Sequence, residues 1–220
     1  MRINKYIAQS TGLSRRVADK AVEQGNVLVN GMPATPGQEV GKQDVVTLSG
    51  KTLTPPLKIQ TIMLNKPVGY VVSRDGQGSK TIYELLPPEL QHLKPIGRLD
   101  KDSSGLLLLT NHGQLAQELT HPKYQKTKIY ELRLSTPLAP LHRQMISDHG
   151  IQLTDGPSKL HLERTTDGDD QNWRITMQEG RNRQIRRTFA ALGYNVTKLH
   201  RTQFGDYSLG NLTPGNFNLR

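Results

Sequence analysis

The sequence predicts an α+β fold, in which a small unit of helices and a hairpin precedes a larger unit dominated by strands. Two observations carry this prediction. Apolar residues cluster in short runs bounded by turn residues, as strands do. Segments with strand and helix patterns do not alternate strictly, which argues against a doubly wound parallel sheet. With 220 residues, the chain suits one medium domain and one small one.

Residues 1–48 are expected to begin with two short helices. Apolar residues recur at helical spacing from Ile3 to Ile7, and Gly12 then interrupts the pattern. Ser14 is placed to cap a second helix, with Gly25 as its stop. The exposed face of this second helix is basic and carries Arg15, Arg16 and Lys20.

A hairpin and a linker are expected after these helices. Val27 and Val29 precede an Asn30-Gly31 turn, a dipeptide that favours tight hairpins. Residues 45–48 add another strand. Residues 49–60, with Pro55-Pro56 at their centre, lack periodicity and are interpreted as a semi-rigid linker.

Residues 61–220 are expected to form the larger unit. Its predicted strands lie at 62–65, 70–73, 106–110, 129–134 and 173–177. Its predicted helices lie at 82–86, 113–119, 139–149 and 183–192.

The charge balance points to an anionic partner. Lys and Arg total 29 against 19 Asp and Glu, a net charge of +10, which is typical of proteins that bind a polyanion. A basic protein without such a partner would show the same balance, because net charge does not define function. The absence of cysteine excludes disulfides, thiolate nucleophiles and thiolate zinc sites.

Nothing in the sequence suggests a membrane partner. The longest uninterrupted apolar run is four leucines, far below the roughly 20 residues that span a bilayer. The N-terminus carries charge but no apolar segment of a signal peptide. We therefore expect a cytoplasmic protein, with a monomer as the default state.

The most informative motif is Gly-Arg-Leu-Asp-Lys-Asp-Ser-Ser-Gly at residues 97–105, which leads into an apolar stretch at 106–109. Asp100 stands between an arginine and a flexible turn, where a nucleophilic carboxylate would be held. An ion pair with an arginine would keep it ionised. The alternative is local capping of backbone N–H groups, a role that we assign to Asp102.

A second motif, Glu-Gly-Arg-Asn-Arg-Gln-Ile-Arg-Arg at residues 179–187, supplies guanidinium groups. If residues 183–192 are helical, Ile185 and Phe189 lie on one face, while Arg183 and Arg186 are neighbours on another. One stripe would then be buried and the other cationic.

Together these motifs resemble the signature of the RNA pseudouridine synthases, in the branch that modifies small- and large-subunit ribosomal RNA. The resemblance covers nearly the whole chain. It implies a mixed, mainly antiparallel catalytic sheet at 61–220 and an isomerisation that uses neither cofactor nor metal. In this reaction uracil is detached from C1′ of its ribose, turned, and rejoined through C5.

The N-terminal unit resembles the alpha-L RNA-binding domain. The matching residues are Gly12, Ser14-Arg15-Arg16, Ala18, Gly25, Val27, Val29 and Asn30-Gly31. Val17 stands where that family often has an acidic residue. A capped amphipathic helix with a solvated basic face is the alternative.

The resemblance also implies roles for individual residues. Asp100 would be the nucleophile, Arg186 its ionic partner and Tyr130 the tyrosine that lies against uracil. The implied substrate-binding residues are Arg98, which fills the gap left by the flipped base, Leu199 beneath the base, Arg183 and Arg187 on phosphates, and Lys66 on RNA. Tyr130 and Leu199 could equally be plain core residues, and Arg98 a surface contact to phosphate.

The substrate is less sharply indicated than the reaction. Residues 97–113 look closer to members that act on 23S ribosomal RNA, and the expected target is a uridine in a stem-loop. A 16S or transfer RNA substrate is the alternative, as is a ribosome-associated RNA-binding protein without catalysis. A glycosidase built on Asp100 and Asp102 is disfavoured, because the basic surroundings suit a polyanion.

Overall fold

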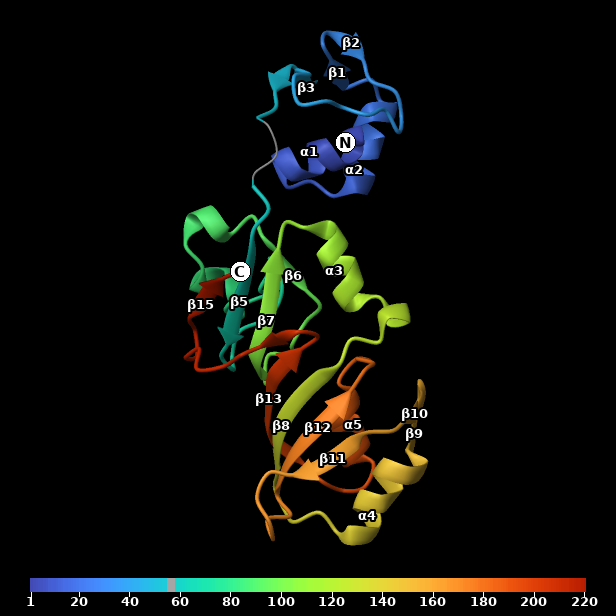
Figure 1. The fold of residues 1–220 in the computed structure, drawn as a ribbon, viewed down its shortest axis with the longest axis vertical. Helices are drawn as coiled ribbons and strands as arrows, with labels where there is room; N and C mark the ends of the chain where they lie inside the picture. Colours follow the sequence, from blue (N-terminus) through green and yellow to red (C-terminus); the bar gives the residue numbers. More distant parts are fainter. Residues whose placement is uncertain (55–57) are drawn as a thin grey trace. The chain divides into compact units, whose positions relative to one another are not determined.

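The computed structural model describes residues 1–54 and 58–220, and the chain divides into two compact units, Met1–Ile59 and Gln60–Arg220 (Figure 1). Pro55 and Pro56, at the centre of the predicted linker, lie outside the described residues. The predicted linker begins too early in the chain, because β4 (Lys51–Thr52) pairs with β3 (Val46–Leu48) and so belongs to the N-terminal unit.

The N-terminal unit has the predicted helices and hairpin. Helix α1 (Ile3–Thr11) ends at Gly12, whose φ of 77° few other residues adopt. Helix α2 (Arg15–Glu23) begins where the Ser14 hydroxyl accepts a hydrogen bond from the Val17 N–H at 3.2 Å. Strands β1 (Val27–Val29) and β2 (Met32–Pro33) complete an antiparallel sheet in the order β2-β1-β3-β4.

The C-terminal unit is built on one large sheet, which confirms the predicted mixed, mainly antiparallel arrangement. Along its main path the order is β11-β12-β8-β13-β7-β5-β15. The strands are β5 (Thr61–Lys66), β6 (Lys94–Ile96), β7 (Ser104–Thr110), β8 (Lys128–Leu134), β11 (His161–Arg164), β12 (Asn172–Met177), β13 (Val196–Phe204), β14 (Tyr207–Ser208) and β15 (Phe217–Leu219). Among the described strands of this sheet, only β7 and β13 pair in parallel.

Several shorter elements surround this sheet. A separate hairpin consists of β9 (Ile151–Leu153) and β10 (Gly156–Ser158). The α-helices are α3 (Gly113–Thr120), α4 (Pro140–Gln144) and α5 (Gln184–Ala190), and α4 continues into a π-helical turn at Met145–His149. Single 3₁₀ turns lie at Ile82–Leu85, Pro88–Leu90 and Pro122–Tyr124.

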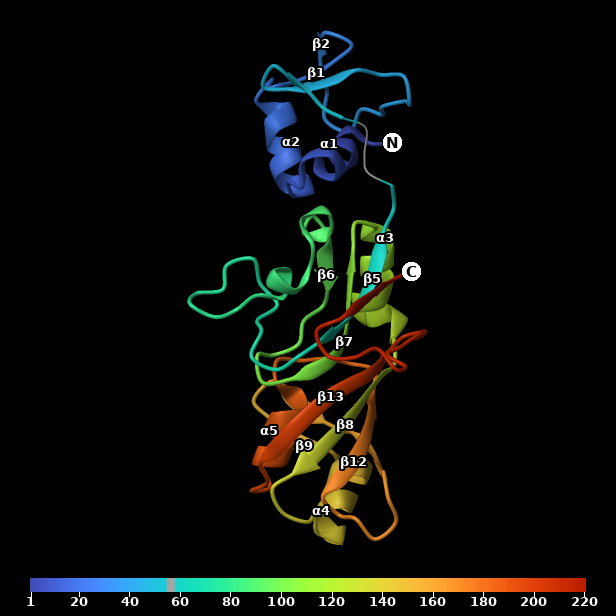
Figure 2. The same ribbon diagram turned by 90° about the vertical axis from the view of Figure 1, so that its left-hand side faces the viewer.

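Strand β7 explains why the core has two layers. Its four leucines alternate between faces: Leu107 and Leu109 join one apolar cluster, and Leu106 and Leu108 join the other. Helix α3 covers one face, and the 3₁₀ turns of residues 82–90 cover the other (Figure 2). Because both faces of β7 are buried, its sequence is a continuous run of apolar residues.

The strand predicted at 70–73 is wrong. Val71 forms only an isolated bridge with Thr81, and its N–H donates to the Lys80 carbonyl at 2.8 Å. The polar loop at 74–80 offers no strand with which this segment could pair. The helix predicted at 82–86 is a 3₁₀ turn, and the one predicted at 139–149 is divided between α4 and the π-helical turn.

Candidate active site

A cleft of about 910 Å³ opens beside the parallel junction of β7 and β13. The loop before β7 forms one wall, and the segment that leads into α5 forms another. Six of the eight predicted catalytic and substrate-binding side chains line it: Arg98, Asp100, Tyr130, Arg183, Arg186 and Leu199. The sequence motifs that carry these residues are far apart in the chain, and the sheet brings them together.

The loop that carries Asp100 is fastened at several points. Gly97 has a φ of 70°, and the side chain of Leu99 is buried in the core. The Ser103 N–H donates to the Asp100 carbonyl at 3.1 Å, which closes a turn. The Asp100 carboxylate is one-third exposed and so remains accessible from the cleft.

Lys66 holds this loop in place through hydrogen bonds to its backbone. The predicted contact of Lys66 with RNA is wrong. Its side chain is fully buried. Its ammonium group donates to three backbone carbonyls, those of Pro67 at 3.0 Å, Asp100 at 3.1 Å and Ser103 at 2.7 Å. Burial lowers the pKa of Lys66 to about 8, although the charges of Asp102 and Asp100 oppose this shift.

The ionic partner of Asp100 is Arg183 rather than the predicted Arg186. Arg183 Nη1 lies 3.5 Å from Asp100 Oδ2. Arg183 also grips Asp102 with a fork of two hydrogen bonds, at 3.1 and 3.0 Å. Its φ of 47° places it outside α5 as the residue before the helix. The prediction assumed a helical Arg183 that was directed at phosphate.

Arg186 supports the loop without touching the Asp100 side chain. It donates to the carbonyls of Val196 at 2.7 Å and Asp102 at 2.9 Å. Its Nε lies 3.3 Å from Asp102 Oδ2, close enough for an ion pair but without hydrogen-bond geometry. Arg186 therefore orients the loop that presents Asp100.

The Asp102 carboxylate accepts a hydrogen bond from its own backbone N–H, which agrees with the capping role predicted for it, but it also binds Arg183 and Arg186. Burial raises its pKa, but the hydrogen bond from Arg183 and the charges of Arg186 and Arg183 outweigh burial and lower the pKa overall. Asp102 thus remains a carboxylate that organises both arginines beside Asp100.

Tyr130 and Leu199 form the apolar side of the cleft. They lie on the paired strands β8 and β13 and are 8% and 7% exposed. Arg98 is exposed at the rim. Arg201, two residues after Leu199, also lines the cleft, and the sequence analysis missed it. Its position in the segment Lys-Leu-His-Arg was the available signal.

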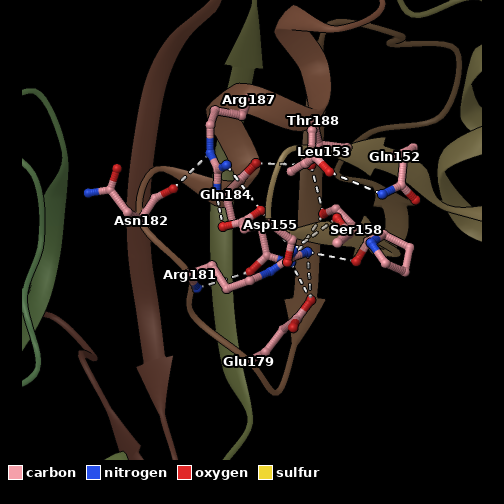
Figure 3. Close-up of polar contacts among 12 residues, drawn as sticks. Gln152, Leu153, Asp155, Ser158, Glu179, Arg181, Asn182, Gln184, Arg187 and Thr188 are labelled. Atoms are coloured by element: carbon pink, nitrogen blue, oxygen red, sulfur yellow. Dashed lines mark hydrogen bonds and ion pairs between the residues drawn. The ribbon is translucent and has the colours of Figure 1, made fainter.

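Arg187 lies in a polar cluster with the β9–β10 hairpin (Figure 3). Arg187 itself does not line the cleft, although Arg181 and Gln184 of the same cluster do. The Arg187 guanidinium forms a fork with Asp155, at 3.1 and 2.7 Å. Arg181 donates to the same carboxylate at 2.9 Å and to the carbonyls of Gly156 and Pro157. Arg187 is thus held by a carboxylate in this structure, and its assignment to phosphate stays a prediction.

In the N-terminal unit, the three basic side chains predicted on α2 are exposed: Arg15, Arg16 and Lys20. Asn30 has a structural role within the hairpin region. Its amide donates to Asp44 at 2.8 Å and accepts from the Val45 N–H at 2.9 Å. Asn30 therefore braces the loop beside the turn.

Two searches concern the described residues only. No cluster of three or more His, Asp or Glu side chains in residues 1–54 and 58–220 is arranged to hold a metal ion. Within the same residues, no helix combines the length and apolar character needed to cross a bilayer.

Two family descriptions match the chain. The RNA pseudouridylate synthase family matches residues 60–191, and the S4 domain matches residues 1–46. The chain belongs to the RNA pseudouridylate synthase family and begins with an S4 RNA-binding domain. It is therefore an isomerase of uridine in RNA, as the resemblance of its motifs implies.

Individual relatives agree with this family assignment. The chain is 36% identical to the ribosomal small subunit pseudouridine synthase A of Pasteurella multocida, over 95% of this chain and 90% of the relative. It is 37% identical to the ribosomal large subunit pseudouridine synthase B of Bacillus subtilis, over 97% and 89%. A crystal structure of a pseudouridylate synthase aligns with a TM-score of 0.71 at 35% identity and covers 100% of this chain and 96% of that one.

Proposed function

We propose that this protein converts one uridine of 23S ribosomal RNA into pseudouridine, with Asp100 as the residue that acts on the ribose. The carrying observation is the placement of the Asp100 carboxylate in a cleft that also contains Tyr130 and Leu199. Arg183 lies beside the carboxylate and compensates its charge. An apolar wall faces an ionised group, which suits a flipped base whose ribose must be attacked.

The residues of the cleft have different roles toward the target nucleotide. Tyr130 and Leu199 contact the uracil ring, while the Asp100 carboxylate reaches the sugar. Arg98, exposed at the rim, is suited to replace the extruded base in the RNA stack, because a guanidinium is planar. Lys66, Asp102 and Arg186 keep the loop in place. The S4 domain supplies affinity through the basic face of α2, and the enzyme acts as a monomer.

The choice of 23S ribosomal RNA is supported by the sequence of residues 97–113, which resembles family members that act on that RNA. Relatives named for the small and the large ribosomal subunit are almost equally similar, at 36% and 37% identity. A 16S or transfer RNA substrate is the second candidate.

The test is tritium release from C5-labelled uridine in fragments of 23S, 16S and transfer RNA. Asp100→Asn is expected to lower the rate at least about 10³-fold while RNA affinity is kept, since phosphate contacts supply most of the binding. Asp167→Asn removes an exposed carboxylate outside the cleft and serves as the control. Turnover by Asp100→Asn at the wild-type rate would contradict the assignment, and modification of 16S or transfer RNA alone would change the substrate.

A further inference from the structure

Arg201 is a buried cation whose hydrogen bonds are incomplete. It lies on β13 and is 2% exposed. Its Nε donates to the Leu106 carbonyl at 2.8 Å, and its Nη1 donates to the Tyr130 hydroxyl at 3.5 Å. Its Nη2 has no hydrogen-bond partner in the part of the chain that the structure describes.

The surroundings of Arg201 contain cations and aromatic rings. None of the ion pairs among the described residues includes it. The guanidinium carbon lies 4.8 Å from the ring centre of Phe204 and 6.0 Å from that of Tyr130. Nearby, burial and the charge of Arg201 both lower the pKa of Lys128. A buried cation without a counter-ion is costly, and such groups concentrate where a reaction supplies the missing charge.

The hydrogen bond to Tyr130 has a fixed direction. A guanidinium contains donors only, so the phenol oxygen must accept. The phenol hydrogen is therefore left to donate elsewhere, and the cleft lies on the accessible side of Tyr130. At 3.5 Å this hydrogen bond is long, and catalytic hydrogen bonds of this kind often shorten in the complex with the substrate.

The backbone holds Arg201 in register with the nucleophile loop. Arg201 is the parallel partner of Gly105. A Cβ built at Gly105 would overlap the backbone nitrogen and carbonyl of Arg201. The pairing of β13 with β8 is also irregular between Arg201 and Gln203, and such bulges redirect side chains near active sites.

We propose that Arg201 is a positioning residue for Tyr130, which turns the phenol hydrogen toward uracil and supplies positive charge to that side of the cleft. When the C1′–N1 bond breaks, its electron pair passes to uracil and spreads over N1 and the two carbonyl oxygens, while the Asp100 carboxylate compensates the positive charge left at C1′. Tyr130, polarised by Arg201, donates a hydrogen bond to this charge. C5 then bonds to C1′, and the proton lost from C5 is balanced by one gained at N1. The inference rests on the proposed function.

A double-mutant cycle tests this coupling, with single-turnover rates, RNA affinity and thermal unfolding measured for Arg201→Gln, Tyr130→Phe and both together. We expect each single variant to lose about 10²-fold in rate, in the range of one positioned hydrogen-bonding group, with RNA affinity unchanged. The double variant should be no slower than the slower single one. Arg133→Gln, an exposed arginine on β8, is the matched control and should keep the wild-type rate.

Two outcomes overturn the proposal: a wild-type rate for Arg201→Gln, or losses that multiply in the double variant. A merely structural role would lower thermal stability without this non-additivity. If Arg201→Gln does not fold, Arg201→Lys replaces it in the cycle, because it keeps the charge but not the planar fork. Asp100→Asn is assayed in parallel. Activity in Asp100→Asn would refute the proposed function, whereas its inactivity beside normal Arg201 variants would refute only this inference.

Discussion

Lys66 and Arg201 are two buried cations on opposite sides of the same strand, and they differ in how fully their hydrogen bonds are satisfied. Lys66 on β5 and Arg201 on β13 are both register partners of Gly105 on β7. The ammonium of Lys66 has three carbonyl acceptors. Arg201 has one carbonyl, a long bond to Tyr130 and a nitrogen without a described partner.

The number of hydrogen-bond acceptors around each cation distinguishes a structural role from a role in the reaction. A cation that is surrounded by backbone acceptors fixes a loop and has nothing left for a ligand. A cation with an unused donor is held at a cost, and it is retained where another charge arrives during the reaction. Burial alone therefore does not tell the two roles apart, and the count of acceptors does.

Gly105→Ala gives the largest expected effect, because it disturbs the common partner of both cations. Gly105 has a φ of 104°, and its Cβ would overlap the Arg201 backbone. We expect a loss of about 4 kcal/mol in the free energy of unfolding, from backbone strain and steric overlap together. Urea denaturation measures it.

Gly113→Ala is the control for this substitution. Gly113 begins α3, and a Cβ there meets nothing within 4 Å. The change should stay within about 1 kcal/mol. Equal stabilities for the two variants would show that β7 and β13 do not approach each other as closely as described.

The pH dependence of stability sharpens the comparison on the Lys66 side. The folded-state pKa of Lys66 is about 8 against an ordinary value of 10.5, so between these values the unfolded chain binds more protons. The free energy of unfolding should therefore rise with pH across this window, by about 3 kcal/mol in total. Below pH 8 the buried lysine is charged in the folded state, and the cost of burying that charge is felt in full.

Lys66→Met should lack this rise, and it should unfold more easily at every pH because three carbonyls lose their donor. The measurement is urea denaturation from pH 7 to above 10, with the exposed Lys159→Met as the matched control. A parallel pH profile for wild type and Lys66→Met would refute the lowered pKa.

Asp155→Asn gives the smallest expected effect, since it concerns a third cation that a carboxylate holds near the surface. Removing this charge releases Arg187 from its fork and loosens Arg181. RNA binding should tighten by less than about tenfold, and the slope of log affinity against log salt should steepen by up to about one phosphate contact. A salt titration measures both. Weaker binding would mean that the cluster in Figure 3 must remain intact to bind RNA.

The sequence predicted local features well and pairings poorly. Gly12 and Ser14 determine helix ends through their own backbone and side chain, so the N-terminal helices could be predicted from sequence. The motif at 97–105 likewise located the carboxylate that lines the cleft. Strand β13 and the β9–β10 hairpin were not predicted as strands, because their stability comes from neighbours that are distant in the chain.

The ionic partners of the site depended on details that no sequence pattern carries. Arg183 adopts a positive φ, a rare conformation for a residue other than glycine, and this turns its side chain back toward Asp100 and Asp102. Lys66 was expected to contact RNA because the resemblance implied it, and nothing in the sequence indicated that this lysine is buried, which is uncommon for lysines. Arg201 was missed because neither motif includes it.

The parallel junction of β7 and β13 has a consequence for the order of folding. Ser104 and His200, whose side chains hydrogen-bond at 2.8 Å, are 96 positions apart in the chain. Contacts of such long range form late, whereas the N-terminal unit closes through pairings of nearby residues. On the ribosome, the cleft cannot exist until Phe204 has been synthesised and released from the exit tunnel. We therefore expect each new molecule to bind RNA before it is able to modify it.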